Sequence, residues 1–265
     1  MIHLRAVSIQ SNGRDGFPFD VPALRDLRLE LERAATLLVG ENGSGKSTLL
    51  EALALATSMI GVGSHSLDRD RSLDAVRPLA DSMRVVWNRR THRGFFMRAE
   101  DFFGFVNRVK AEQAALEKEA ARVRAENPGM AASDLARMLG PQTGSRHELA
   151  ERYGEDPDAR SHGQQFLAFF QSRLVPGGLY LLDEPEVALS PTSQLAFLGL
   201  LLDAIRDAEC QFLIATHSPI LMALPGATIL SFDDPPVRAL EYDEVEHVRL
   251  TRDFLEAPER FLRHL

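Results

Sequence analysis

A stretch of nine residues near the start of the sequence combines glycines with a lysine and hydroxyl side chains. These residues are Gly40, Glu41, Asn42, Gly43, Ser44, Gly45, Lys46, Ser47 and Thr48. The glycines let successive backbone N–H groups turn inward and form a nest for phosphate oxygens. Lys46 adds a positive charge for the β- and γ-phosphates, and the Ser47 hydroxyl can bind Mg²⁺. The spacing fits G-x-x-x-x-G-K-[ST], which predicts a site for a nucleoside triphosphate with Mg²⁺.

A pair of acidic residues, Asp183 and Glu184, ends an apolar run that starts at Leu179. Buried parallel strands read as such runs, and open α/β sheets bind ligands at the carboxyl ends of their strands. Because a phosphate-binding loop lies upstream, we expect Asp183 to hold Mg²⁺ through water. Glu184 is then expected to act as general base on the attacking water.

Two further segments stand where a helix begins and where a strand ends. Ser161-His162-Gly163-Gln164-Gln165 leads into a predicted helix, and Thr216-His217-Ser218-Pro219 follows an apolar strand. A histidine after a strand is often an ordinary loop residue. The position of His217 after the carboxylate-bearing strand favours a functional role.

Strands and helices that could position these residues alternate along the sequence. Alternating or continuous apolar runs predict strands at 2–9, 27–31, 36–39, 84–87, 94–97, 179–182, 211–215, 227–232 and 237–241. Helices are expected at about 46–59, 101–126, 131–139, 164–174 and 192–208, with a short one from Pro219 and a surface helix at 250–265 broken near Pro258.

This alternation predicts an α/β fold in one domain, residues 1–265. We expect a mainly parallel core sheet flanked by helices, an antiparallel N-terminal sheet, and a helical lobe at about 101–160 inserted in the core. The first helix of the lobe would be about 35 Å long. It is expected to pack as part of the lobe rather than to serve as a partner-binding arm.

The composition excludes several classes of protein. A net charge of −8 argues against a surface that is basic throughout, although a local basic stripe stays open. Apolar runs fall short of the roughly 18–20 residues that span a bilayer, and the N-terminus lacks a signal-peptide pattern. The single cysteine, Cys210, fits a reducing compartment. We therefore expect a cytoplasmic protein without direct membrane insertion.

The four segments, in this order, resemble those of the ATP-binding cassette (ABC) ATPases, and the resemblance covers nearly the whole chain. The tracts Leu181–Pro191 and Ala215–Pro219 look closest to a stand-alone predicted-ATPase branch of the P-loop NTPases, related to DNA-repair cassette proteins and SMC-like heads. The resemblance implies ATP and Mg²⁺ as cofactors. It also implies a head-to-tail homodimer with two ATP molecules at the interface.

The resemblance further implies roles for single residues at the phosphates and the metal. The loop Gly40–Thr48 would bind ATP, with Ser47 and Asp183 at the metal. Lys46, Glu184 and His217 would be catalytic, and His217 matches the switch histidine that contacts the γ-phosphate.

Ser161, Gly163 and Gln164 match the signature loop, which contacts the γ-phosphate bound by the opposite subunit. A small hydroxyl, a close backbone and a helix N-terminus all suit an anion.

Three departures from the family pattern stand in the sequence. His162 replaces the usual signature glycine, and Ser190 replaces an aspartate that helps to organise the opposite site. The sequence has no glutamine between Gln10 and Gln113, so the usual metal-sensing glutamine is missing. Glu100 lies about where that residue belongs and could bind Mg²⁺ or water instead, or be an ordinary surface carboxylate.

A basic cluster with interleaved aromatic residues is open to three interpretations. It comprises Arg84, Arg89, Arg90, Arg93 and Arg98, with Trp87, Phe95 and Phe96. Arginines with aromatic residues suit phosphate backbones and stacked bases, so contact with nucleic acid is possible. A solvated face and a surface for a protein partner are the alternatives. Phe17 and Phe19 are candidates for stacking on adenine.

Three functions are compatible with these patterns. The first is an ATP hydrolase that acts as a nucleotide-driven dimerisation switch. The second, favoured by the missing glutamine and by Ser190, is a non-catalytic nucleotide sensor that regulates a partner such as a nuclease. The third is the nucleotide-binding subunit of a membrane transporter, against which the missing glutamine-bearing loop argues.

Overall fold

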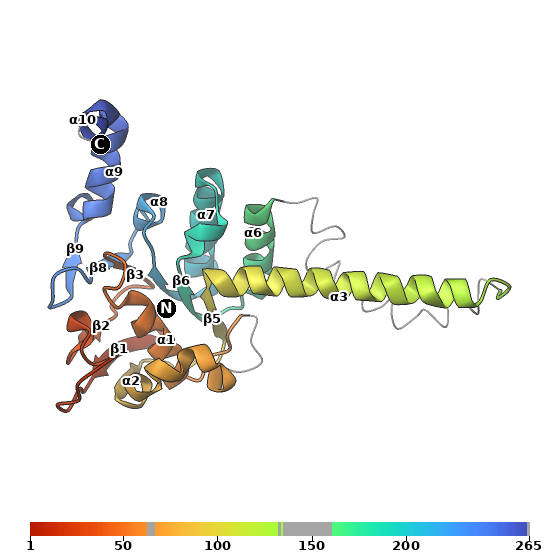
Figure 1. The fold of residues 1–265 in the computed structure, drawn as a ribbon. Helices are drawn as coiled ribbons and strands as arrows, with labels where there is room; N and C mark the ends of the chain where they lie inside the picture. Colours follow the sequence, from red (N-terminus) through yellow and green to blue (C-terminus); the bar gives the residue numbers. More distant parts are fainter. Residues whose placement is uncertain (63–66, 132–133, 135–160, 264–265) are drawn as a thin grey trace.

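The computed structural model describes residues 1–62, 67–131, 134 and 161–263, and two β-sheets organise this part of the chain (Figure 1). The predicted helix at 131–139 and the rest of the predicted lobe fall largely outside the described residues. The lobe at 101–160 as a unit, and the single domain of residues 1–265, therefore stay predictions.

The larger sheet is mainly parallel, as predicted. Its described strands, in spatial order, are β5 (Gly94–Arg98), β6 (Leu179–Asp183), β7 (Gln211–Ala215), β3 (Ala35–Val39), β8 (Thr228–Ser231) and β9 (Arg238–Leu240). All neighbours pair in parallel except β8 and β9, which are antiparallel. Every residue of β3, β6 and β7 is buried, which explains their continuous apolar runs.

The smaller sheet is antiparallel and comes from the N-terminal part of the chain. Its order is β2 (Arg28–Glu30), β1 (Leu4–Ile9) and β4 (Met83–Trp87). Helix α1 (Lys46–Ala56) packs between the two sheets, because its Leu50 and Leu53 share one buried cluster with Val7 of β1 and Leu181 of β6. The smaller sheet and the core sheet therefore hold α1 from two sides.

The opposite face of the larger sheet is covered by α6 (His162–Arg173) and α7 (Pro191–Ala208). Phe170 of α6 meets Phe197 of α7 with ring centroids 4.8 Å apart, edge to face. Phe170 also lies 6.1 Å from Tyr180 of β6. This aromatic layer fixes α6 and α7 on the sheet.

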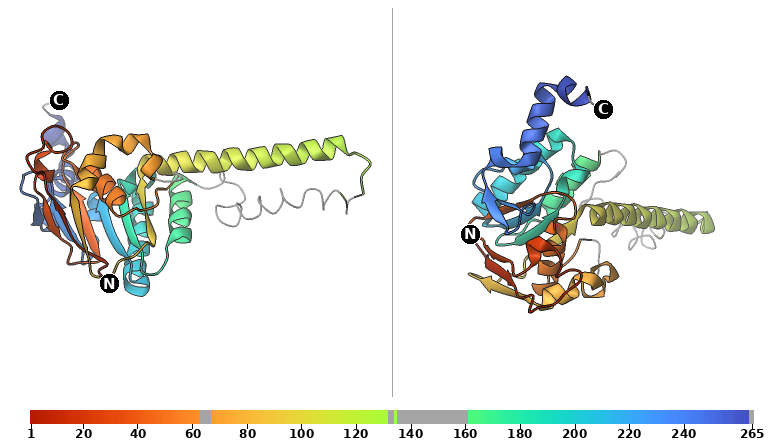
Figure 2. Two further views of the ribbon diagram at one scale, coloured as in Figure 1. Left: turned by 90° about the horizontal axis from the view of Figure 1, so that it is seen from below. Right: turned by 60° about the vertical axis from the view of Figure 1, so that its left-hand side comes forward.

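Helix α3 (Ala99–Glu126) follows β5 and leaves the body as a long arm (Figures 1 and 2). Its first turn is anchored by Phe102, which is fully buried against Phe166 of α6. Most of its later described residues are exposed or half-buried. The predicted helix at 101–126 is therefore present, and its described part extends outward.

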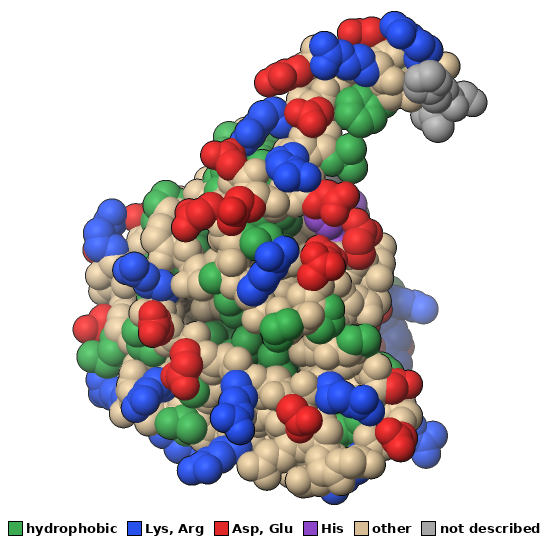
Figure 3. Space-filling model, turned by 90° about the vertical axis from the view of Figure 1, so that its left-hand side faces the viewer, with side chains coloured by type: hydrophobic (Ala, Val, Ile, Leu, Met, Phe, Trp, Pro, Cys, Tyr) green, Lys and Arg blue, Asp and Glu red, His purple; other side chains and the backbone are tan. Residues whose placement is uncertain are grey.

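The C-terminal part of the chain forms a second projection. It consists of α9 (Glu246–Glu256) and α10 (Pro258–Leu262), which follow the short helix η5 (Tyr242–Glu244). The short helix α8 (Pro219–Met222) lies earlier in the chain, and its Leu221 and Met222 are buried in the core. Figure 3 shows this projection standing out from the body, with acidic, basic and hydrophobic side chains along it. The predicted helical tail begins four residues earlier than expected, and its break lies at Ala257, beside Pro258.

Short helical turns connect the larger elements. They are η1 (Pro22–Leu24), η2 (Leu67–Arg69), η3 (Arg71–Val76), α2 (Arg77–Asp81) and η4 (Pro185–Ala188). Within the described ranges, no helix has the length and apolar character needed to cross a bilayer.

Candidate functional site

The loop after β3 has the backbone of a phosphate nest. Gly40 has φ +142° and Gly45 has φ +104°, conformations that residues with a Cβ rarely adopt. A Cβ at Gly40 would lie 2.8 Å from Asp233 Oδ1, and one at Gly45 would lie 2.8 Å from Val21 Cγ1. Both positions therefore require glycine, and the loop packs closely against neighbouring residues on both sides.

Lys46 opens α1 and turns its amine back into the loop. Its side chain is buried, and Nζ donates to the carbonyls of Gly40 at 2.7 Å and Glu41 at 2.8 Å. Burial lowers the pKa of Lys46, while the nearby charges of Asp233 and Glu184 oppose that shift. The loop thus holds a preformed, desolvated positive charge, as an anion site requires.

Ser47 and Asp183 meet although 136 residues separate them in the sequence. The Ser47 hydroxyl donates to Asp183 Oδ1 at 3.0 Å. Burial raises the pKa of Asp183 to about 7, with the hydrogen bond from Ser47 acting in the opposite direction. A hydroxyl and a buried carboxylate are oxygen ligands that suit Mg²⁺, which usually binds few protein groups and keeps several waters.

The chemistry of these donors fits Mg²⁺ without a larger acidic cluster. Among the described residues, no three His, Cys, Asp or Glu side chains gather as a metal site. The ion would therefore rely on Ser47, Asp183, phosphate oxygens and water.

Glu184 and His217 lie side by side at the ends of β6 and β7. The Glu184 N–H donates to the carbonyl of Ala215 at 2.9 Å, which extends the pairing of the two strands by one residue. Glu184 has a left-handed backbone, φ +50° and ψ +50°, so its side chain leaves the strand direction. Its Oε1 lies 3.5 Å from His217 Nε2.

The ring of His217 is partly buried, and its Nε2 has no hydrogen-bond partner. Burial and the charge of Lys46 lower the pKa of His217, which favours the neutral imidazole. A buried polar atom without a partner is unfavourable, and a phosphate oxygen would satisfy it.

Ser161 and Gln164 form the first turn of α6, apart from the phosphate-binding loop. The Gln164 N–H donates to Ser161 Oγ at 3.3 Å, and the Ser161 N–H donates to Gln164 Oε1 at 3.2 Å, a capping box. A Cβ at Gly163 would lie 2.7 Å from Ser193 Oγ, so this turn packs tightly on α7. The structure therefore groups Gly40–Thr48, Asp183, Glu184 and His217, and places Ser161, Gly163 and Gln164 elsewhere.

Two of the residues that depart from the family pattern, His162 and Ser190, have local structural partners. The ring of His162 lies 6.0 Å from that of Phe103 on α3, so it contacts the base of the arm. Ser190 caps α7, because its Oγ accepts from the N–H of Ser193 at 3.3 Å. Glu100 is exposed and lies 3.4 Å from Arg98 Nε; its binding of Mg²⁺ or water stays a prediction.

The basic cluster is not one surface, and its interpretation as an interleaved arginine–aromatic face is wrong. Phe95 and Phe96 lie in β5 and are buried, so they cannot stack on bases. Arg98 is also largely buried and pairs with Asp101 at 2.9 Å and Asp70 at 3.2 Å. The reason is that β5 belongs to the core sheet, under α3 and α6. The exposed arginines that remain are Arg84, Arg89, Arg90 and Arg93.

The two adenine-stacking candidates differ in exposure. Phe19 is 4% exposed and belongs to the core cluster, whereas Phe17 is 57% exposed. Phe17 lies in the segment before Val21, which packs on Gly45 of the phosphate-binding loop. Phe17 is therefore the candidate that is open to a ligand.

Sequence reasoning missed three residues near the site. The N–H of Glu41 donates to Asp233 Oδ1 at 2.6 Å, and the N–H of His217 donates to Glu186 Oε1 at 2.6 Å. His247 of α9 lies with its Nε2 3.2 Å from His217 Nδ1. Asp233 and Glu186 each follow a buried strand closely, a signal that could have found them. His247 has no local signal, because its partner is 30 residues away.

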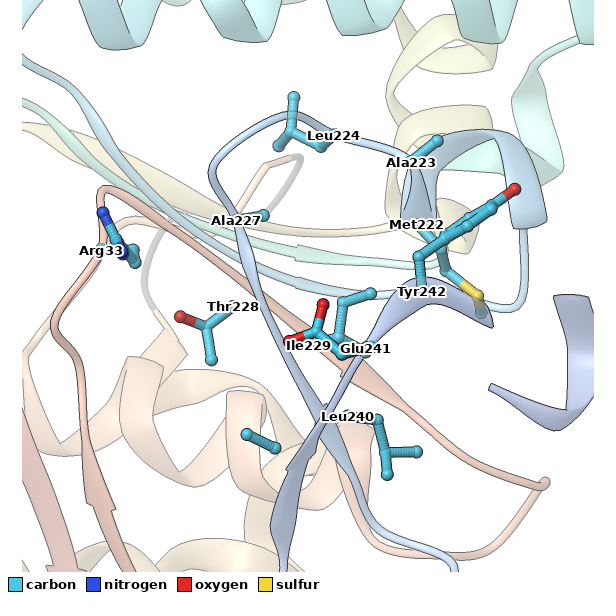
Figure 4. Close-up of a pocket in the computed structure, with 11 residues that line it drawn as sticks. Arg33, Met222, Ala223, Leu224, Ala227, Thr228, Ile229, Leu240, Glu241 and Tyr242 are labelled. Carbon is cyan, nitrogen blue, oxygen red and sulfur yellow. The ribbon is translucent and has the colours of Figure 1, made fainter. Parts of the chain in front are cut away.

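A separate pocket lies at the other end of the strands (Figure 4). Arg33, Thr228, Glu241 and Tyr242 are among its lining residues. Arg33 precedes β3, whereas the phosphate-binding loop follows it, so the pocket is remote from that loop. The pocket shares no residue with the predicted site.

Two protein families match parts of the chain. Residues 18–77 match a family described as an AAA domain, and residues 164–223 match one described as an AAA domain, putative AbiEii toxin, type IV TA system. The first match contains the phosphate-binding loop, and the second contains Asp183, Glu184 and His217.

Among curated relatives, the macrolide export ATP-binding/permease protein MacB of Bradyrhizobium diazoefficiens is 31% identical over 207 residues. The match covers 75% of this chain and 28% of that protein, so the chain spans less than a third of the relative's length. An uncharacterised ABC transporter ATP-binding protein of Mycobacterium tuberculosis is 27% identical over 188 residues, which cover 69% of this chain and 67% of that protein.

Two solved structures have a similar fold. A nucleotide-free ATP-binding cassette from an ABC transporter matches with a TM-score of 0.51 and 17% identity, covering 96% of each chain. The Smc head domain of Pyrococcus furiosus, bound to the C-terminal domain of ScpA, matches with a TM-score of 0.50 and 14% identity, covering 98% of this chain and all of that one.

Proposed function

Because the chain belongs to the ABC-type P-loop ATPases, related to transporter ATP-binding domains and SMC heads, we propose that it hydrolyses ATP with Mg²⁺ as a dimerisation switch. One observation carries the proposal. The Ser47–Asp183 hydrogen bond and the Glu184–His217 contact lie at the carboxyl ends of strands in one sheet, beside the buried amine of Lys46.

Each residue has a chemical task in this proposal. Lys46 and the N–H groups of the loop hold the phosphates, and the dipole of α1 adds positive potential at the same place. Glu184 accepts a proton from the attacking water. His217 donates its Nε2–H to a phosphate oxygen. Bound Mg²⁺, held through Ser47 and Asp183, supplies positive charge that stabilises the transferring phosphoryl group.

The first turn of α6 supports the dimer. Ser161 and Gln164 are exposed and stand at the positive end of a twelve-residue helix, yet they hydrogen bond with each other. We propose that they contact the γ-phosphate bound by a second copy of the chain in a head-to-tail homodimer. In such a dimer, Ser161 and Gln164 of one subunit would complete the phosphate site of the other subunit.

Calorimetric titration with Mg–ATP tests the phosphate-binding role. Lys46→Ala is expected to weaken binding at least a hundredfold, because the loop loses its only full charge for the phosphates. Lys110→Ala, which removes a lysine from the α3 arm, is the matched control and should bind as the wild type does. Equal affinity of the wild type and Lys46→Ala would refute the role of Lys46.

A second candidate, the ATP-binding subunit of a membrane transporter, is favoured by the similarity to a macrolide export ATP-binding/permease protein. Reproducible co-purification with an integral membrane protein would support it over a stand-alone switch.

The non-catalytic nucleotide sensor remains the alternative within the switch class. Phosphate release at protein concentrations high enough for dimerisation would exclude it. Each of these functions uses cytoplasmic ATP, so we propose a cytoplasmic location for the domain.

A further inference from the structure

The proposed switch histidine has a partner on the C-terminal projection. His217 Nδ1 and His247 Nε2 are 3.2 Å apart, and the two ring centroids are 5.1 Å apart with the rings inclined at 60°. His247 is the second residue of α9. A side chain from the C-terminal helix thus reaches the site formed by the core sheet.

The base of α9 is fixed in place, so this contact is not that of a loose tail. Val245 and Val248, on either side of His247, are 2% and 3% exposed and belong to the core. The Tyr242 hydroxyl donates to the carbonyl of Pro219 at 3.1 Å, two residues after His217. The turn before α9 and the segment that carries His217 are therefore joined at two points.

The surroundings of His217 decide which of its nitrogens carries the proton. A neutral imidazole has one N–H group. The Nε2 atom makes no hydrogen bond within the described chain, and the carboxylate oxygen Oε1 of Glu184 lies 3.5 Å from it. A carboxylate oxygen accepts hydrogen bonds, so an oxygen beside Nε2 favours the proton on that atom. The Nδ1 atom is then an acceptor, and His247 Nε2 lies at hydrogen-bond distance from it. Among the described residues, His247 must therefore be the donor.

A competing acceptor for His247 lies farther away. Glu41 Oε1 of the phosphate-binding loop is 3.8 Å from His247 Nε2, which is too long for a hydrogen bond, and the Glu41 side chain is 73% exposed. His217 Nδ1 is the nearer acceptor. Glu41 contributes only a longer-range attraction to a proton on His247.

We infer that His247 is a positioning residue, whose Nε2–H donates to His217 Nδ1 and thereby holds the His217 ring with its Nε2–H toward Glu184. This deepens the proposed function, because the same Nε2–H would meet the phosphate of ATP. The hydrogen bond itself exists without nucleotide, so it can be tested separately from hydrolysis. Histidines at functional sites are commonly oriented in this way by the group that binds their other nitrogen.

The first experiment reads the ring protons of the full chain without nucleotide. Two-bond ¹H–¹⁵N correlations of the carbon-bound ring protons, recorded near pH 8 and assigned with His217→Gln and His247→Gln, report which nitrogens are protonated. We expect Nε2 protonated and Nδ1 unprotonated in His217, with Nε2 protonated in His247. An unprotonated Nε2 in His247, or a proton on Nδ1 of His217, would overturn the inference whether or not the protein hydrolyses ATP.

The second experiment measures the catalytic consequence. His247→Phe keeps the ring but removes the donor, and we expect kcat for ATP to fall about tenfold with KM changed less than twofold. His247→Gln retains an N–H donor at similar reach and should restore most of kcat. His92→Phe, at an exposed position in the turn between β4 and β5, is the control.

A double-mutant cycle separates positioning from general damage to the fold. If His247 acts through His217, then His247→Phe should have no further effect on kcat in a His217→Ala background. Equal losses in both backgrounds would contradict the positioning role. A wild-type protein without any ATPase activity would instead count against the proposed function and leave the ring-proton result as the decisive test of the hydrogen bond.

Discussion

At the scale of single residues, the site is built from charges that are removed from water before any ligand binds. Lys46 and Asp183 are both buried, and burial shifts both pKa values toward the neutral form. Such an arrangement is unfavourable for the empty protein and favourable once phosphates and a cation compensate the charges. Nucleotide and metal should therefore stabilise the fold strongly.

The carboxyl group of Asp183 allows the free-energy cost of burying these charges to be measured. Its pKa in the folded protein is raised to about 7, above the ordinary value of 3.8. The folded state is therefore destabilised as pH rises from about 4 through 7. At pH 8 the full free-energy cost of ionising the buried Asp183 carboxyl is present. We expect Asp183→Asn to increase the free energy of unfolding of the nucleotide-free protein at pH 8 by about 1–4 kcal/mol, and the gain to vanish near pH 4.

The same variant should lose the stabilisation by Mg–ATP, because an amide is a poor ligand for Mg²⁺. Denaturant unfolding at pH 4 and 8, with and without Mg–ATP, measures both effects. Asp253→Asn, on the exposed face of α9, is the control. A destabilised Asp183→Asn protein at pH 8 would contradict the account.

At the scale of elements, the ends of helices and strands position the chemistry. Ser190 is the N-cap of α7, and α7 carries Ser193 against Gly163 in the first turn of α6. The serine caps the N-terminus of α7 at the position where the family usually has an aspartate. Aspartate is an equally good N-cap.

Substitutions at this cap test how much Ser190 contributes to stability. Ser190→Ala is expected to lower the free energy of unfolding by about 1 kcal/mol, whereas Ser190→Asp should leave it within about 0.5 kcal/mol. Urea unfolding checks both values. If Ser190→Ala were as stable as the wild type, the hydrogen bond from the Ser193 N–H to Ser190 Oγ would contribute nothing to α7.

The elements themselves could largely be predicted from the sequence. The strands at 179–182 and 211–215 lie within β6 and β7, because a strand covered on both faces is a continuous apolar run with polar residues at its end. Contacts between residues that lie far apart in the sequence could not be predicted. The His217–His247 pair, and the burial of Arg98 among Asp70 and Asp101, depend on how helices dock, and no local pattern records that.

At the scale of the whole molecule, the proposed dimer would divide each ATP site between two subunits. The phosphate-binding loop and the first turn of α6 lie apart, and two helical projections, α3 and α9–α10, leave the body. A second copy placed head to tail would bring the first turn of α6 of one subunit to the phosphates of the other. In this proposal, bound ATP would therefore hold the two subunits together.

Ser161→Asp tests this arrangement without disturbing the subunit. Aspartate caps α6 as well as serine does, but it would place a negative charge where the account expects the partner's γ-phosphate. In a Glu184→Gln background with Mg–ATP, we expect a dimer by light scattering, and a monomer when Ser161→Asp is added. Affinity for ATP in the monomer should change less than threefold. An unchanged dimer would contradict the head-to-tail interface.

The central claim is that Glu184, at the end of β6, activates water against ATP held by the loop after β3. Phosphate release from Mg–ATP in a single turnover, with wild type and Glu184→Gln compared at saturating protein, tests it most directly. The account predicts release by the wild type and a rate at least a hundredfold lower for Glu184→Gln, with ATP still bound. Equal rates for the two proteins would contradict it.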